Sequence, residues 1–146
     1  MYVDAQDLLS DAQAFTGTAV STNGRDTAAA GNDITEGEPL GIGITVDVAA
    51  DATTGDETYQ FDAIQSAAAA LTSPDVLASR IIAAASLSLG SRHVLPIPPG
   101  SKTKRYLGLQ LTLGGTTPTI TITAFIAPLS FLGGWKAHAK GATVQS

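Results

Sequence analysis

The chain has 146 residues, of which 5% are aromatic and 14% charged, and it contains no cysteine. This length fits one domain, and the lack of cysteine excludes a disulfide framework, a thiolate zinc site and a cysteine nucleophile. All 13 acidic residues lie in residues 1–75 with a single basic residue, Arg25, whereas every other basic residue lies in residues 76–146. Residues 1–15 lack a signal-peptide pattern, and no apolar run approaches the roughly 20 residues of a membrane span, so we expect no membrane partner.

Alternation of apolar with small or polar residues dominates the sequence and indicates β-strands with one buried face. The clearest predicted strands are residues 40–48, 59–64, 107–113 and 119–126. Weaker strands are predicted at residues 14–22, 76–84 and 91–97. Pro96 cannot donate a ladder hydrogen bond, so the strand that contains it should end there or lie at a sheet edge.

The segments between these strands carry turn or helix signals. Residues 4–14 permit a short helix or a loose arm, and the alanine-rich stretch 63–71 predicts about two helical turns. The glycine-containing segment 114–118 predicts a hairpin between its two flanking strands. Residues 23–39 and 51–57 are expected to be polar loops, and part of the first can pair as a strand.

Seven or eight short strands with polar turns predict an all-β, two-sheet antiparallel sandwich. We divide the chain into an N-terminal arm (1–13), a β-sandwich domain (14–128) and an extended C-terminal tail (129–146). The strand pattern crosses residue 75 without a linker, so both charge halves should share one sandwich. We therefore predict that N-terminal acids meet C-terminal bases across sheet edges or between subunits.

The sequence contains no recognisable catalytic constellation. His93 falls in a predicted strand and His138 in the tail, and no G-x-S-x-G motif accompanies them, so both are interpreted as structural or exposed. Asp51, Asp56 and Glu57 share one loop that could hold calcium, but their spacing differs from an EF-hand, which favours a solvated loop. We expect a protein that is not an enzyme and has no catalytic, cofactor or metal site.

A compact basic and aromatic cluster is formed by Lys102, Lys104, Arg105 and Tyr106. Such groups can bind phosphates, which is one interpretation. The acidic half of the chain opposes a polyanion, so a charged strand end or a patch for an acidic protein surface is favoured over direct nucleic-acid binding.

Five runs carry family information: MYVDAQDLLSDAQAFTGTAVST (1–22), VDVAADATTGDETYQF (46–61), LTSPDVLASRIIAAA (71–85), LPIPPG (95–100) and RYLGLQLTLGGTTPTITITAFIAP (105–128). In order and spacing they resemble the cement, or decoration, proteins of tailed-phage heads, above all the cement protein family of Bordetella-type bacteriophage. The resemblance implies a jelly-roll-like fold and homo-oligomers on the exterior of an icosahedral head. It also implies bridging of major capsid protein subunits against internal DNA pressure, and it transfers no catalytic or cofactor residue.

The expected partners are therefore the major capsid protein and a second copy of the chain, with a dimer favoured over a trimer. Such a protein is made in the host cytoplasm and ends on the virion. The candidate subunit or capsid contacts are Tyr2, Val3, Leu8 and Leu9 in the arm, Lys102, Lys104 and Arg105 in the cluster, and Phe131, Leu132 and Trp135 in the tail. The alternative is a carbohydrate-binding, lectin-like module on the virion surface, for which Tyr2, Tyr59, Tyr106 and Trp135 are the available stacking residues.

Overall fold

The computed structural model describes residues 8–26, 40–98, 104–129 and 132. Its elements are β1 (Leu8–Phe15), β2 (Ala19–Val20), β3 (Arg25–Asp26), β4 (Leu40–Val48), β5 (Thr58–Ser66), β6 (Asp75–Ile81), the 3-10 turn η2 (Ala84–Ser86), β7 (Arg92–Ile97), β8 (Tyr106–Gly114) and β9 (Ile120–Pro128). Within the described ranges no helix is long and apolar enough to cross a membrane.

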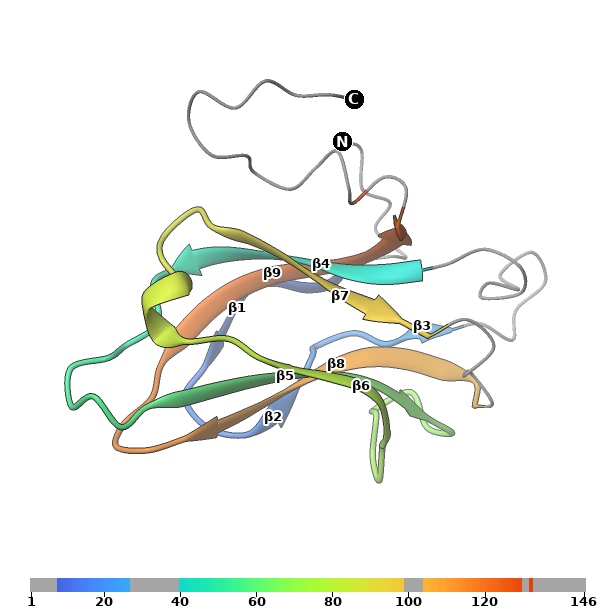
Figure 1. The fold of residues 1–146 in the computed structure, drawn as a ribbon. Helices are drawn as coiled ribbons and strands as arrows, with labels where there is room; N and C mark the ends of the chain where they lie inside the picture. The colour runs from blue at the N-terminus through green and yellow to red at the C-terminus, as the bar shows by residue number, and fades with distance from the viewer. Residues whose placement is uncertain (1–7, 27–39, 99–103, 130–131, 133–146) are drawn as a thin grey trace, which may run out of the picture.

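The strands form two sheets that lie face to face (Figure 1). Sheet A has the order β1-β9-β4-β7, and sheet B has the order β2-β8-β5-β6, with β3 also pairing with β8. Every paired strand is antiparallel. The expected all-β, two-sheet antiparallel sandwich is therefore confirmed, and its jelly-roll-like character stays a prediction.

The core lies between the sheets, where the alternation turns one face of each strand inward. Ile42 and Ile44 of β4 face the space that Phe61 of β5 and Leu109 of β8 enter from the other sheet, and all four are almost fully buried. Each such side chain contributes roughly 1.5–3 kcal/mol through removal from water. The strands with the most regular period of two therefore form the centres of both sheets.

The strand predictions hold best where the alternation is unbroken. The predicted strand 40–48 coincides with β4, and β5, β8 and β9 contain the other three clear predictions. The weaker predictions at 76–84 and 91–97 correspond to β6 and β7, and β7 is an edge strand, as Pro96 requires. Residues 14–22 contain only the end of β1 and the short β2.

The start of the domain differs from the prediction, because residues 8–13 belong to β1 and not to an arm or a helix. This strand pairs with β9, but its register shifts between Leu8 and Ser10 and again between Ser10 and Gln13. Ala12 also has a positive φ of 49°. These irregularities break the period of two, which explains why the sequence did not reveal the strand.

Two local predictions were wrong. Residues 63–66 continue β5 instead of starting a helix, because β5 is hydrogen-bonded on both sides by β6 and β8, and this pairing outweighs the helix propensity of alanine. Residues 114–118 do not close a hairpin, since β8 lies in sheet B and β9 in sheet A. Gly115, at φ 92°, lets this crossing turn approach the Asp56 carbonyl, where a side chain would collide.

Candidate functional site

The basic cluster lies at one end of sheet B, where β8 begins beside β3. Arg105 holds Asp26 through two hydrogen bonds, from Nε to Oδ1 and from Nη2 to Oδ2, each 2.8 Å long. The bonded carboxylate of Asp26 raises the pKa of the Arg105 guanidinium. The guanidinium carbon also lies 5.1 Å from the ring centre of Tyr106, within range of a cation–π contact.

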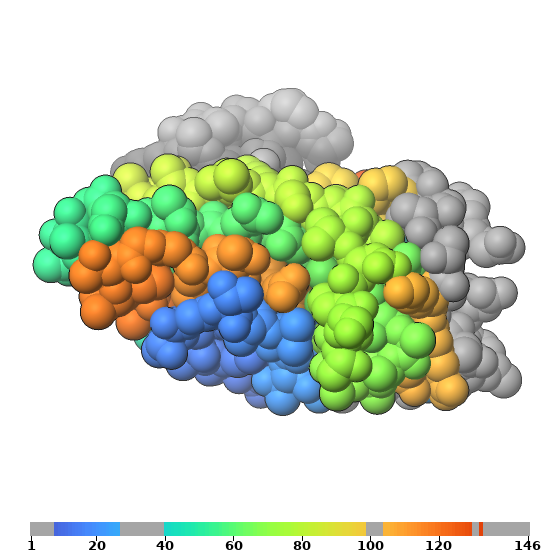
Figure 2. Space-filling model, turned by 90° about the horizontal axis from the view of Figure 1, so that it is seen from below, coloured from blue at the N-terminus to red at the C-terminus, as the bar shows by residue number. Residues whose placement is uncertain are grey.

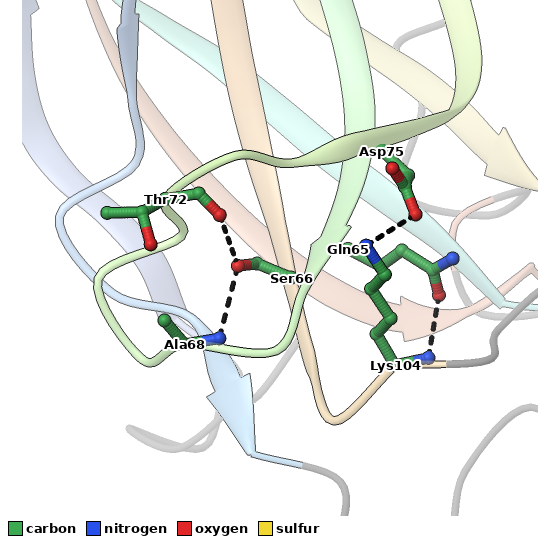
Figure 3. A network of polar contacts seen from close by, with 6 residues as sticks. All are labelled: Gln65, Ser66, Ala68, Thr72, Asp75 and Lys104. Carbon is green, nitrogen blue, oxygen red and sulfur yellow. Dashed lines mark hydrogen bonds and ion pairs between the residues drawn. The ribbon is translucent and has the colours of Figure 1, made fainter.

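A second ion pair joins the residues just before β8 to the first residue of β6 at the same end (Figure 3). Lys104 Nζ lies 2.7 Å from Asp75 Oδ2, and the Lys104 backbone N–H donates to Gln65 Oε1 at 3.0 Å. Gln65 stands opposite Asp75 in the β5–β6 register. The predicted meeting of N-terminal acids with C-terminal bases is thus confirmed, within one chain, for Asp26 with Arg105 and Asp75 with Lys104.

These pairs change what the cluster can do chemically. Lys104 and Arg105 each face an acid, so the described part of the cluster has little excess positive charge to offer a polyanion. All four side chains are partly exposed, so solvent screens both pairs and each contributes little to stability. The arrangement supports the interpretation as a charged strand end.

A loop that the sequence did not predict covers part of the outer face of sheet B beside this cluster. Ser66 Oγ donates to the Thr72 carbonyl at 2.6 Å and accepts from the Ala68 N–H at 3.1 Å, which fixes the return of residues 67–72 (Figure 3). Leu71 is buried beside Gly24 and Gly108, where a side chain at Gly108 would collide with it. In the sequence, only Gly108, a glycine within a leucine-rich strand, indicates that another side chain packs closely there.

The outer face of sheet A carries a second, smaller apolar cluster, which we call the outer-face cluster. Its buried members are Phe125, Ala127 and Leu132, and the partly buried Leu8, Val94 and Leu129 pack against them. Leu132 has no exposed surface at all. The chain that leaves β9 therefore packs back onto its own sheet through Leu129 and Leu132.

Two glycines of β4 make room for this packing. A Cβ atom on Gly41 would lie 2.6 Å from Leu129 Cδ2 and 2.9 Å from Leu132 Cδ1. A Cβ atom on Gly43 would lie 2.7 Å from Phe125 Cζ and 2.9 Å from Leu132 Cδ2. Such distances are too short for carbon atoms, so the small residues on the outer face of β4 are needed for the leucines to approach.

The predicted contact residues occupy several different environments. Leu9 is completely buried between the sheets, and Leu132 is completely buried on its own sheet A, so neither is exposed to a partner in this structure. Leu8 is half-buried in the outer-face cluster. The predicted contacts Tyr2, Val3, Lys102, Phe131 and Trp135 lie outside the described residues.

The acidic loop between β4 and β5 uses its carboxylates to order its own backbone and that of the crossing turn. Asp51 Oδ1 accepts from the Thr53 N–H at 3.1 Å, and Asp56 accepts from the backbone N–H and the hydroxyl of Thr116 at 3.0 and 2.9 Å. The two Thr116 bonds lower the pKa of Asp56. Across the described ranges no group of three or more His, Cys, Asp or Glu residues could hold a metal ion.

His93 has the surroundings of a structural residue. His93 is buried at the start of β7, and its Nε2 lies 3.1 Å from Ser91 Oγ. His138 lies outside the described residues.

A protein-family model, Bbp16, matches residues 9–127. The chain belongs to the Bbp16 family. The family bears the name of a Bordetella phage protein, so this is a phage-related protein. A search of curated proteins gave no match.

The Bbp16 match covers the sandwich except for Leu8, the first residue of β1, and Pro128, the last residue of β9, and it includes both ion pairs at the charged end. It stops two residues before Leu129. The outer-face cluster therefore combines Val94, Phe125 and Ala127 inside the matched region with three leucines outside it, Leu8, Leu129 and Leu132.

Proposed function

We propose that this Bbp16-family protein is a capsid cement protein. It binds the outer surface of a tailed-phage head, bridges major capsid protein subunits and stabilises the shell mechanically, without enzymatic activity. The observation that carries the proposal is the family match over residues 9–127, which overlaps all five runs that resemble phage cement proteins.

The described surface supports a role in protein contacts. Large apolar side chains are exposed at Val48, Val76, Ile81 and Leu89. The buried centres of protein interfaces are depleted in charge, and only 14% of this chain is charged. The two ion pairs at the charged end join residues of the same chain, so they leave little charge there to attract a partner, and apolar contacts are the better candidates.

The carbohydrate-binding alternative loses support at one of its four aromatic residues. Tyr59 is fully buried, and its hydroxyl donates to the Asp51 carbonyl at 2.6 Å. It cannot stack on a sugar. Tyr106 is half-buried and lies beside Arg105. We therefore favour the cement function.

The direct test uses phage heads prepared without this protein. Purified protein is added at micromolar concentration, the heads are sedimented, and bound protein and the head disruption temperature are measured. The proposal predicts saturable binding and a higher disruption temperature. A control with heads that already carry the protein should show neither effect. Absence of binding to the bare heads would refute the proposal.

A further inference from the structure

The segment between β2 and β3 contains the only Asn-Gly pair of the chain, Asn23-Gly24. An asparagine before glycine cyclises more readily than other asparagines, because glycine has no side chain to hinder the approach of its amide nitrogen to the asparagine side chain. Asn23 is exposed. Figure 2 shows the blue part of the chain, which includes β2 and β3, open at the surface along one rim of sheet B. Water therefore reaches this pair.

The two nitrogen atoms that the cyclisation involves are only weakly held. The Asn23 N–H donates to the Leu9 carbonyl at 3.0 Å, whereas the Gly24 N–H donates no hydrogen bond to any residue of the described ranges. Backbone N–H groups without a partner are uncommon in folded proteins. Asn23 Nδ2 lies 3.4 Å from the Leu8 carbonyl oxygen, which is long for a hydrogen bond. The attacking nitrogen of Gly24 and the leaving nitrogen of Asn23 are therefore both available.

The hydroxyl of Ser21 favours the reactive form of this peptide group. It accepts from the Leu109 N–H at 3.2 Å and donates to the Asn23 carbonyl oxygen at 2.8 Å. The Asn23 carbonyl and the Gly24 N–H belong to one peptide group, so loss of the amide proton places negative charge on that carbonyl oxygen. A hydrogen bond to the charged form of a group favours this form, and Ser21 is only 3% exposed, where such a bond is stronger than in water.

We propose that Asn23 is a self-modification site, which the folded chain converts without an enzyme to aspartate and isoaspartate. The Gly24 nitrogen gives its proton to solvent base and forms a bond to Cγ of Asn23. The Cγ–Nδ2 bond breaks, Nδ2 takes a proton from solvent and leaves as ammonia, and a five-membered succinimide ring remains. Water then opens the ring at one of its two carbonyl carbons. Opening at Cγ gives aspartate, and opening at the main-chain carbonyl gives isoaspartate.

The products change the contacts of this segment. Asn23 Nδ2 now donates to the Leu8 carbonyl, but a carboxylate only accepts, so two oxygen atoms would face each other there. Isoaspartate also lengthens the main chain by one carbon between Ser21 and Arg25, which are both hydrogen-bonded or paired to β8. The conversion therefore weakens the attachment of β1 to this segment, and it makes the formal net charge of −5 one unit more negative.

Trypsin gives a direct test, because Arg25 is the first basic residue of the chain. Digestion releases residues 1–25, in which Asn23 is the only asparagine, and residues 26–80, in which Asn32 is the only one. After incubation of the folded full chain in mildly alkaline buffer, peptide 1–25 should become about 1 Da heavier and accept methyl groups from an isoaspartyl methyltransferase. Peptide 26–80 is the internal control, since Asn32 precedes Asp33, and it should convert far more slowly. No conversion of peptide 1–25, or equal conversion of both peptides, would overturn the proposal.

Variants of Ser21 separate the folded site from the reactivity of the dipeptide alone. Ser21→Ala should slow the conversion of peptide 1–25 about fivefold in the folded protein, as expected for the loss of one hydrogen bond to the reacting group. Ser21→Thr keeps the hydroxyl and should convert like wild type. In urea all three chains should convert at one rate, because the hydrogen bond is absent there.

Circular dichroism checks that both variants are folded, and the wild-type measurement does not depend on either of them. A folded Ser21→Ala that converts as fast as wild type, or a difference between the chains that persists in urea, would refute the role of Ser21.

Discussion

The outer-face cluster predicts that Gly41→Ala destabilises the protein by detaching Leu129 and Leu132 from sheet A. The new methyl group would lie 2.6 Å from one leucine and 2.9 Å from the other. Overpacking of this kind costs about 1–3 kcal/mol. The destabilisation is limited, because the leucines can move off the sheet instead of being compressed. Moving one leucine off the sheet loses its burial, which contributes roughly 1.5–3 kcal/mol. Replacing a strand glycine by alanine recovers about 0.5–1 kcal/mol, so we expect a net loss of about 1–2 kcal/mol.

Urea denaturation followed by circular dichroism measures this loss, and a double-mutant comparison assigns it. In a Leu129→Ala/Leu132→Ala background the obstructing side chains are gone, so Gly41→Ala should be neutral or stabilising. Gly17→Ala is the control, because nothing lies within 4 Å of a Cβ there, and it should change stability by less than about 0.5 kcal/mol. An unchanged stability for Gly41→Ala, or an equal loss in both backgrounds, would refute the contact.

Three further predictions follow from local geometry. Thr116→Val should raise the pKa of Asp56 in an NMR titration, because the backbone bond from Thr116 stays but the hydroxyl bond that also lowers this pKa is lost. The hydroxyl bond stabilises the fold at neutral pH, and this contribution is lost as pH falls through the lowered pKa. A variant that titrates like wild type would contradict the prediction. Thr117 has a φ of 47°, a left-handed conformation that glycine adopts at lower cost. Thr117→Gly should therefore raise the free energy of unfolding, measured by urea denaturation, by about 1 kcal/mol, and a lower free energy of unfolding would contradict this. Arg105→Gln should leave the urea midpoint almost unchanged, because its pair with Asp26 is exposed to solvent and screened. A clear loss of stability that persists in 1 M salt would contradict this expectation.

The regular strands could be predicted from sequence because each has one buried face. β4 is the clearest case, where every second residue from Leu40 to Val46 faces the core. The irregular β1 could not be found this way, since its pairing depends on contacts with β9 far along the chain. The segment 114–118 shows a related limit: its residues signal a turn, but whether a turn closes a hairpin or crosses between sheets is decided by the rest of the fold.

For the candidate site, the meeting of acids and bases could be predicted from the sequence, but the individual partners could not. The separation of acids from bases along the sequence was sufficient to predict that they meet, but the partners Asp26 and Asp75 depend on how β3 and β6 flank sheet B. The glycines of β4 were recognisable as a face of small residues. That Leu129 and Leu132 pack on this face depends on where β9 ends beside β4, which no local pattern encodes.

The central claim is that this Bbp16-family protein lies on the outside of a phage head and joins capsid subunits. A low-resolution map of heads before and after addition of the purified protein tests it most directly. The account predicts added density on the outer surface, placed across the boundaries between major capsid protein subunits. Added density only inside the shell or at the tail, or identical maps at saturating protein, would contradict it.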